Sequence, residues 1–223
     1  MEKCYIKIIV EGLEEYALFD VVKQLGTNEN ICLEVEDAEG AGNIPDLLLD
    51  ALRLELYDCV FCVYDVDNKA DDYNSQFNKT RGMLLSVLGE EKLVDIISVC
   101  TNPNILQFYL LAADVLNNVS LINGSKKANS SLVHKYWDNV ASGKTDKQGR
   151  LIKPDYTASK WQVDILKYSI IDGTYSYEKM LENAKQLPID YFHCCPASNL
   201  LPLLIALKSG DLNYFKKVKD ALN

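Results

Sequence analysis

The first half of the chain alternates short apolar runs with segments whose apolar residues recur at helical spacing. The apolar runs predict strands at residues 5–10, 57–64 and 94–100, and alternating apolar and polar residues predict another strand at 31–36. The helical segments occupy residues 13–25, 45–56, 77–88 and 105–116. Gly26 suits the end of the first helix, and Pro45 fits the first turn of the second. This β-α alternation predicts a parallel sheet covered by helices, with the strongly apolar run 57–64 as a central strand.

The second half has a different pattern. Residues 117–155 are polar and contain several glycines, which predicts loops around a short helix near 131–139. Residues 156–187 predict two helices separated at Asp172–Gly173, and the segments 197–208 and 211–222 predict two more. We therefore expect an α/β core over residues 1–118 and a helical elaboration over 119–223, packed together as one structural unit.

Composition limits the class of protein. The chain has 223 residues, 48% of them hydrophobic, which is enough for one core. No apolar run approaches the roughly 20 residues of a membrane span, and the first 12 residues do not read as a signal peptide. A cytoplasmic protein without a membrane partner is expected. The seven cysteines are scattered, and Cys59 and Cys62 would point to opposite faces of a strand, so we expect reduced thiols rather than a zinc or redox pair.

Charge is distributed unevenly. The net charge is −9, but residues 1–125 hold 8 basic and 22 acidic residues, whereas residues 126–160 hold 8 basic and 3 acidic residues. An acidic half beside a basic segment suits a cation site next to a phosphate-binding surface. Charge alone favours two solvated surfaces without a joint purpose. The candidate nucleic-acid contacts are Lys69, Arg81, Lys126, Lys127 and Lys135.

Acidic residues follow two of the predicted strands. Glu11 ends the first strand, Asp65 and Asp67 end the central one, and Glu15 falls on the first turn of the following helix. Open α/β sheets bind ligands beyond the carboxyl ends of their strands. Asp65 and Asp67 are two residues apart, so an extended backbone would point both side chains the same way. These residues are therefore expected to meet at one rim of the sheet.

Clustered carboxylates repel one another unless a cation compensates their charge. Donor sets made only of oxygen select hard cations such as Mg²⁺ or Mn²⁺. Such an ion can polarise a phosphodiester and lower the pKa of a bound water. Gly12 is expected to let a phosphate approach the backbone at the strand–helix turn. Taken singly, each acid is also compatible with a turn, a helix cap or a solvated surface.

The combination of E-G after the first strand and D-x-D after the central strand resembles the Toprim domain. The matching stretches are IIVEGLEEY (residues 8–16) and VYDVDN (residues 63–68), and Glu11, Gly12 and Glu15 fit the E-G-x-x-E form of Toprim nucleases. The chain also resembles the RloB-like group of bacterial defence proteins. That resemblance rests on TNPNILQFYLLAADVL (residues 101–116) and CPASNLLPLL (residues 195–204), and the matching stretches follow one another in order along most of the chain.

The resemblance implies a Toprim-like, Rossmann-like fold and a metal-dependent endonuclease that cuts DNA or RNA in antiviral defence. In that family pattern Glu11, Asp65 and Asp67 bind one or two Mg²⁺ or Mn²⁺ ions, and Glu15 supports them. The implied partners are nucleic acid, a partner ATPase or another defence protein, and further copies of the chain in a homo-oligomer.

The chain also departs from the family pattern. Leu106 stands where the RloB-like motif has a glutamate, and the lysine common after E-G is absent. A degenerate Toprim domain that binds nucleic acid, nucleotide or a partner without cutting is therefore the alternative. A D-x-D phosphatase is a third class, but it expects the motif after an early strand and leaves Glu11 unexplained.

Overall fold

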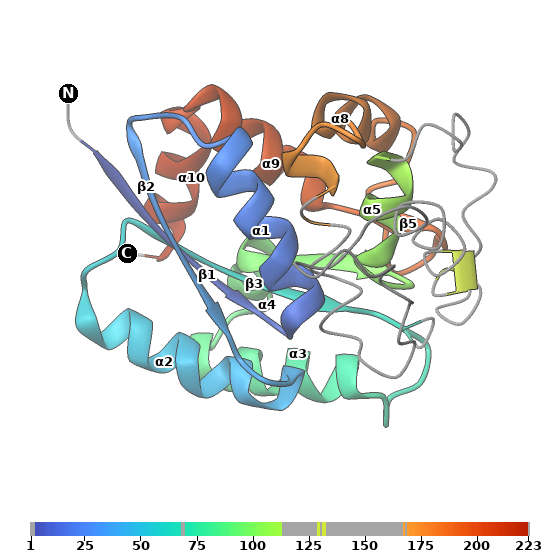
Figure 1. Ribbon diagram of the computed structural model, residues 1–223. Coiled ribbons are helices and arrows are strands. Elements are labelled where there is room, and N and C mark those ends of the chain that lie inside the picture. Colours follow the sequence, from blue (N-terminus) through green and yellow to red (C-terminus); the bar gives the residue numbers. More distant parts are fainter. Residues whose placement is uncertain are drawn as a thin grey trace, which may run out of the picture.

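The computed structural model describes residues 3–67, 70–112, 129, 131–132, 167 and 169–222. Its described strands form one sheet in the order β2-β1-β3-β4-β5 (Figure 1). They are β1 (Cys4–Val10), β2 (Ile31–Asp37), β3 (Cys59–Asp65), β4 (Ser98–Asn102) and β5 (Ala197–Ser198). The first four are parallel, and β5 pairs antiparallel with β4. The predicted α/β class with a mainly parallel sheet is confirmed.

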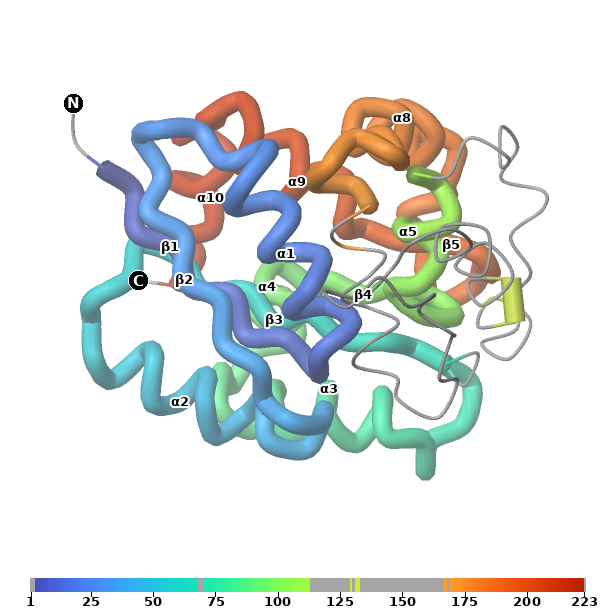
Figure 2. Tube along the Cα trace, in the orientation of Figure 1, coloured from blue at the N-terminus to red at the C-terminus, as the bar shows by residue number. Residues whose placement is uncertain are grey.

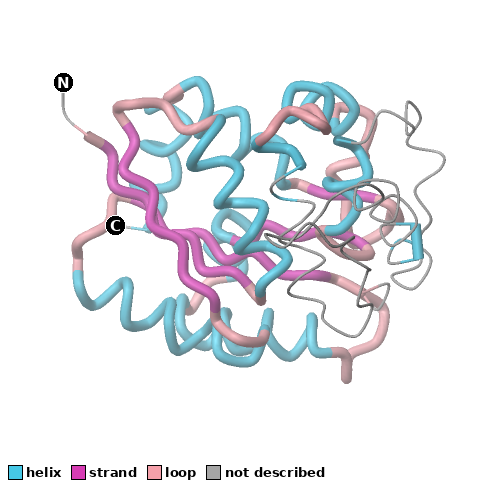
Figure 3. The backbone as a smooth tube through the Cα atoms, in the orientation of Figure 1, coloured by secondary structure: helices cyan, strands magenta, loops and turns pink. Residues whose placement is uncertain are grey.

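Helices lie on both sides of this sheet (Figure 3). They are α1 (Leu13–Leu25), the short 3₁₀ helix η1 (Ala41–Asn43), α2 (Ile44–Leu54), α3 (Gln76–Leu88), α4 (Glu91–Ile97), α5 (Leu106–Ala112), α8 (Tyr177–Ala184), α9 (Leu200–Ser209) and α10 (Leu212–Leu222). Helices α1 and α9 pack together on one side, and α2 and α3 pack together on the other (Figure 1). This placement follows from right-handed crossovers, because the chain moves from β1 to β2 in one direction and from β2 to β3 in the other.

The core is centred on β3. All seven residues of this strand are buried, as predicted for a strand covered on both faces. Tyr64 packs against Phe77 of α3, with ring centroids 5.7 Å apart, and Phe61 stacks on Tyr214 of α10 at 6.3 Å. All seven cysteines are free thiols, and both Cys59 and Cys62 are buried.

Several predicted elements differ from the structure, among them the strand expected from residue 57, which begins at Cys59. The segment 94–100 is not one strand, because Val94 to Ile97 form the end of α4 and β4 begins at Ser98. Val94 and Ile97 are buried three residues apart, a spacing that places both on one face of a helix. The helix expected to reach residue 56 ends at Leu54, since Glu55 takes a left-handed conformation with φ of 52°. The helix expected from residue 197 begins at Leu200, after the short strand β5.

The C-terminal segments belong to the same packed unit as the first half. Asn199, next to β5, accepts from the Cys100 N–H at 2.7 Å and donates to the Ser98 carbonyl at 2.9 Å. The two ends of the described chain lie close together (Figure 2), and Lys3 and Leu222 line one cavity. The expected boundary between residues 118 and 119 lies outside the described residues. Among the residues that are described, no helix has the length and apolar character that crossing a membrane requires.

Candidate metal centre

The carboxyl ends of β1 and β3 bring the first two acids together. The two strands are neighbours in parallel register, with Val10 opposite Val63. The Glu11 N–H donates to the Val63 carbonyl at 2.9 Å, which continues the ladder by one bond. In return, the Asp65 N–H donates to Glu11 Oε2 at 2.9 Å. The Glu11 side chain therefore reaches across to β3 and lies at the rim beside Asp65.

Asp65 is held firmly in place. Its side chain is buried, and Oδ1 accepts hydrogen bonds from the Thr101 hydroxyl at 2.6 Å and from the Ile105 N–H at 3.0 Å. Both donors come from the end of β4 and the turn that follows it. Because a carboxylate fixed by two buried donors has little rotational freedom, Asp65 is preorganised as a ligand.

Asp67 joins the same site, although by a different route from the one expected. Strand β3 ends at Asp65, and Asp67 has a left-handed backbone with φ of 56° rather than an extended one. Its N–H donates to the Pro103 carbonyl at 2.9 Å, which anchors the turn to the end of β4. Glu11, Asp65 and Asp67 all line a small cavity of about 60 Å³, which the start of α3 closes. These three residues therefore share one rim of the sheet, but the acids whose carboxylate oxygens lie within 4.8 Å of one another are a different set, in which only Asp65 recurs.

Glu15 is buried on the first turn of α1. Its Oε2 accepts from the Gly12 N–H at 3.1 Å, so that this N–H is engaged within the chain rather than offered to a phosphate. Burial raises the pKa of the Glu15 carboxyl well above its ordinary range, and the negative charges of Glu11 and Glu14 raise it further.

Glu14 is a site residue that the sequence analysis missed. Carboxylate oxygens of Glu14, Glu15 and Asp65 lie within 4.8 Å of one another. The Glu14 backbone carbonyl is held by the Tyr109 hydroxyl at 2.8 Å, which ties the first turn of α1 to α5. The run of two glutamates was visible in the sequence, but the approach of both side chains to Asp65 depends on how α1 packs on the sheet.

The donor set fits a hard divalent cation. The acids that meet at this rim contribute only carboxylate oxygens, which suit Mg²⁺, Mn²⁺ or Ca²⁺ and not zinc. Asp65 belongs both to the group lining the small cavity and to the group with Glu14 and Glu15. Asp65 is therefore the residue that a cation would contact in either group.

Of the predicted nucleic-acid contacts, Arg81 is the one that lies among the described residues, and it is engaged away from the acids. Arg81 on α3 forms an ion pair with Asp95 of α4 at 2.7 Å, and its guanidinium lies over the Phe192 ring at 5.2 Å. Lys69, Lys126, Lys127 and Lys135 lie outside the described residues.

Leu106, at the position of the family glutamate, is buried, and Gln107 donates to the Ala197 carbonyl at 3.1 Å. Neither side chain supplies a carboxylate.

Comparisons with protein-family models, with curated proteins and with solved structures find no match for this chain. The Toprim and RloB-like resemblance therefore stays a prediction.

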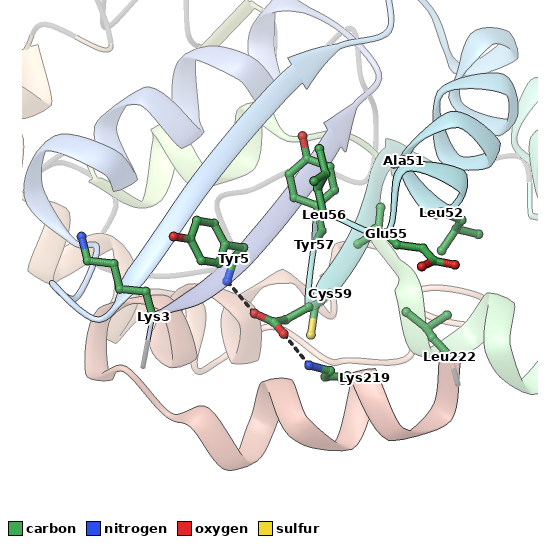
Figure 4. A pocket seen from close by; sticks show the side chains of 12 residues that line it. Lys3, Tyr5, Ala51, Leu52, Glu55, Leu56, Tyr57, Cys59, Lys219 and Leu222 are labelled. Atoms are coloured by element: carbon green, nitrogen blue, oxygen red, sulfur yellow. Dashed lines mark hydrogen bonds and ion pairs between the residues drawn. The ribbon is translucent and has the colours of Figure 1, made fainter. Parts of the chain in front are cut away.

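A larger cavity lies at the opposite end of the sheet, where β1 and β3 begin (Figure 4). It measures about 870 Å³, and its lining includes Tyr5, Tyr57 and Lys219. Asp58 also lines it. The Asp58 carboxylate accepts a hydrogen bond from the Tyr5 N–H at 2.9 Å and another from Lys219 Nζ at 2.5 Å. None of the acids of the candidate metal centre lines it, so the larger cavity and the candidate metal centre lie at opposite rims of the sheet.

Proposed function

We propose that this protein is a metal-dependent nuclease that hydrolyses phosphodiester bonds in DNA or RNA. One observation carries the proposal: acids from separate parts of the sequence meet at the carboxyl rim of a parallel sheet. Glu11 follows β1, Glu14 and Glu15 begin α1, and Asp65 ends β3. This rim is where open α/β sheets bind their ligands.

The chemistry follows from the oxygen donors. A divalent cation held by Glu11, Asp65 and Asp67 would supply charge neutralisation at a phosphodiester and a bound water of lowered pKa. The protein's own residues provide the geometry, since Thr101 and Ile105 fix Asp65, and the Asp65 N–H fixes Glu11. Burial and the neighbouring acids raise the pKa of the Glu15 carboxyl, which favours its neutral form while no cation is bound.

The basic segment 126–160 is the proposed surface for the nucleic-acid backbone, because a protein of net charge −9 needs a local positive region to bind phosphates. A role in antiviral defence, a partner ATPase and a homo-oligomer rest on the resemblance alone and stay predictions.

A cleavage assay tests the proposal. The purified full chain is incubated with supercoiled plasmid, single-stranded DNA and tRNA, each with Mg²⁺, Mn²⁺ or EDTA. It is compared with Asp65→Asn, which removes one charge from the centre, and with Asp50→Asn, which removes one charge from a side chain that is 69% exposed on α2. Thermal unfolding confirms that both variants are folded.

We expect cutting of at least one substrate that requires metal, is lost in Asp65→Asn and survives in Asp50→Asn. If the protein instead binds nucleic acid without cutting it, and EDTA does not change this binding, the result would support the degenerate Toprim binding module. Release of phosphate from small phosphomonoesters would support the D-x-D phosphatase. Cutting by Asp65→Asn at the wild-type rate would show that the acid rim is not the active site.

A further inference from the structure

Asn104, in the turn between β4 and α5, has an unusual environment. Its side chain is 0% exposed, yet neither Nδ2 nor Oδ1 has a hydrogen-bond partner within the part of the chain that the structure describes. The side-chain oxygens of the neighbouring buried amides Asn102 and Gln107 also have no partner there, but the nitrogen of each one, unlike that of Asn104, donates a hydrogen bond. Asn102 donates to the Tyr191 carbonyl at 2.9 Å, and Gln107 donates to the Ala197 carbonyl at 3.1 Å. Both hold segments of the chain together, whereas Asn104 forms no such bond.

A buried amide without partners is costly for the fold, since its donor and acceptor have both lost their hydrogen bonds to water. Such groups are rare in folded proteins, and each one calls for a specific explanation. A ligand that is bound during function is one explanation, and the position of Asn104 supports it.

Asn104 lies between two residues that hold the acids of the candidate metal centre. The Pro103 carbonyl accepts from the Asp67 N–H at 2.9 Å, and the Ile105 N–H donates to Asp65 Oδ1 at 3.0 Å. Standard covalent geometry then places the Asn104 Cα within about 5.5 Å of Asp65 Oδ1. Asn104 does not line the small cavity itself, but its backbone borders the groups that hold Asp65 and Asp67.

We propose that Asn104 completes this site, with Oδ1 as a neutral oxygen ligand of the cation. The assignment rests on the proposed metal-dependent function. Hard cations bind the carbonyl oxygens of asparagine as well as carboxylates. A neutral oxygen adds a ligand without adding negative charge beside Glu11, Glu14, Glu15, Asp65 and Asp67, where a further carboxylate would meet strong repulsion.

Asn104→Leu tests the proposal, with two measurements on the full chain. The substitution removes both unpartnered groups while keeping a side chain of similar length. We expect the metal-free melting temperature to stay the same or rise, because no hydrogen bond is lost. We expect the Kd for Mn²⁺, measured by calorimetry, to rise about 10-fold or more.

Gln107→Leu is the matched control, because it removes a buried amide three residues away that does have a partner. It should lower the metal-free melting temperature and leave the Kd for Mn²⁺ of the folded protein within about 2-fold of wild type. The opposite pattern, in which Asn104→Leu lowers the melting temperature and leaves the Kd unchanged, would overturn the assignment and make Asn104 a structural residue.

Asn104→Asp covers the case in which the leucine variant does not fold. It keeps the ligand oxygen and adds a charge, so it should bind Mn²⁺ at least as tightly as wild type and lower the metal-free melting temperature. A higher Kd for Mn²⁺ in Asn104→Asp than in wild type would contradict the assignment. If the wild-type protein binds no Mn²⁺, the proposed metal-dependent function is wrong. If wild type and Asn104→Leu bind Mn²⁺ with equal affinity, only the role of Asn104 is refuted.

Discussion

The Glu11 carboxylate accepts a hydrogen bond of 2.9 Å from the Asp65 N–H, so the acid that follows β1 is tied to the acid that ends β3. Because of this bond, substitutions can distinguish the structural role of Glu11 from the role of its charge. Glu11→Gln keeps an oxygen that can accept from Asp65, so we expect the free energy of unfolding to change by less than about 1 kcal/mol. We expect the Kd for Mn²⁺ to rise about 10-fold or more, because one charged ligand is lost.

Glu11→Ala removes the acceptor as well as the charge. Because the Asp65 N–H then loses its bond to the Glu11 carboxylate, this variant should lose about 1–3 kcal/mol of stability in urea unfolding. Calorimetry on both variants checks the metal affinity. A Gln variant that binds Mn²⁺ as tightly as wild type would remove Glu11 from the ligand set.

Glu15 should make the metal-free protein less stable as the pH rises. Its folded pKa is raised above the ordinary value of about 4.5, chiefly by burial and then by Glu11 and Glu14, so the folded state holds this proton more tightly than the unfolded state does. Below pH 4.5 the group has no effect, and above it the wild type loses stability until the pH passes the raised folded pKa.

Glu15→Gln should abolish this loss, because the amide does not ionise and can still accept from the Gly12 N–H. Urea unfolding in EDTA from pH 4 to pH 9 measures this difference. The free energy of unfolding of the variant, relative to that of wild type, should increase by about 1.4 kcal/mol for each pH unit between the unfolded and folded pKa values of Glu15. Asp50→Asn should follow the wild-type profile. Parallel curves for wild type and Glu15→Gln would show that Glu15 does not carry the pH dependence.

Thr101 acts on the site through Asp65. Its hydroxyl donates to Asp65 Oδ1 at 2.6 Å inside the fold, so Thr101→Val leaves the carboxylate with one donor fewer. We expect a stability loss of about 1–3 kcal/mol and a rise of about 10-fold in the Kd for Mn²⁺. Thr27→Val, which removes a hydroxyl bonded to the Val22 carbonyl at the far end of α1, should leave the Kd unchanged. A Thr101→Val variant of normal metal affinity would show that this bond serves stability alone.

The sequence was sufficient to place Glu11 and Asp65 at one rim, because strand order and strand ends can be read from apolar runs, and parallel strands share their carboxyl edge. The residues that complete the site were less predictable. Glu14 meets Asp65 only because of how α1 packs, with the Tyr109 hydroxyl bonded to its carbonyl. Asn104 was not singled out either, since its isolation depends on burial, which a sequence does not show.

The errors in the fold have the same origin. The run 94–100 is mostly apolar, and a short apolar run fits a buried strand as well as the buried face of a helix. Strand β5 has two residues and exists through its pairing with Thr101 and Asn102 of β4, about 95 positions earlier in the chain. Local pattern cannot reveal a strand that depends on so distant a partner.

The opposite rim should contribute to stability independently of the metal centre. Asp58 joins the start of β1 to α10, since Oδ2 accepts from the Tyr5 N–H and Oδ1 from Lys219 (Figure 4). Burial alone would raise the pKa of Asp58, but the hydrogen bonds from Lys219 and Tyr5 outweigh it and hold the pKa below its ordinary value of 3.8. A lowered folded pKa stabilises the protein above pH 3.8, and this contribution is lost as the pH falls through the folded pKa.

Asp58→Asn should therefore be less stable than wild type at pH 7, and the difference should shrink steadily below pH 3.8. The loss should be small and should diminish further in 1 M salt, because the pair with Lys219 is partly exposed and is screened by ions. Urea unfolding at pH 7 and at lower pH, at two salt concentrations, measures both effects. The Kd for Mn²⁺ should not change, since Asp58 lies at the end of the sheet remote from Asp65. A higher Kd for Mn²⁺ in Asp58→Asn would mean that the two rims are coupled through β3. That result would contradict the assignment of separate roles to the two rims.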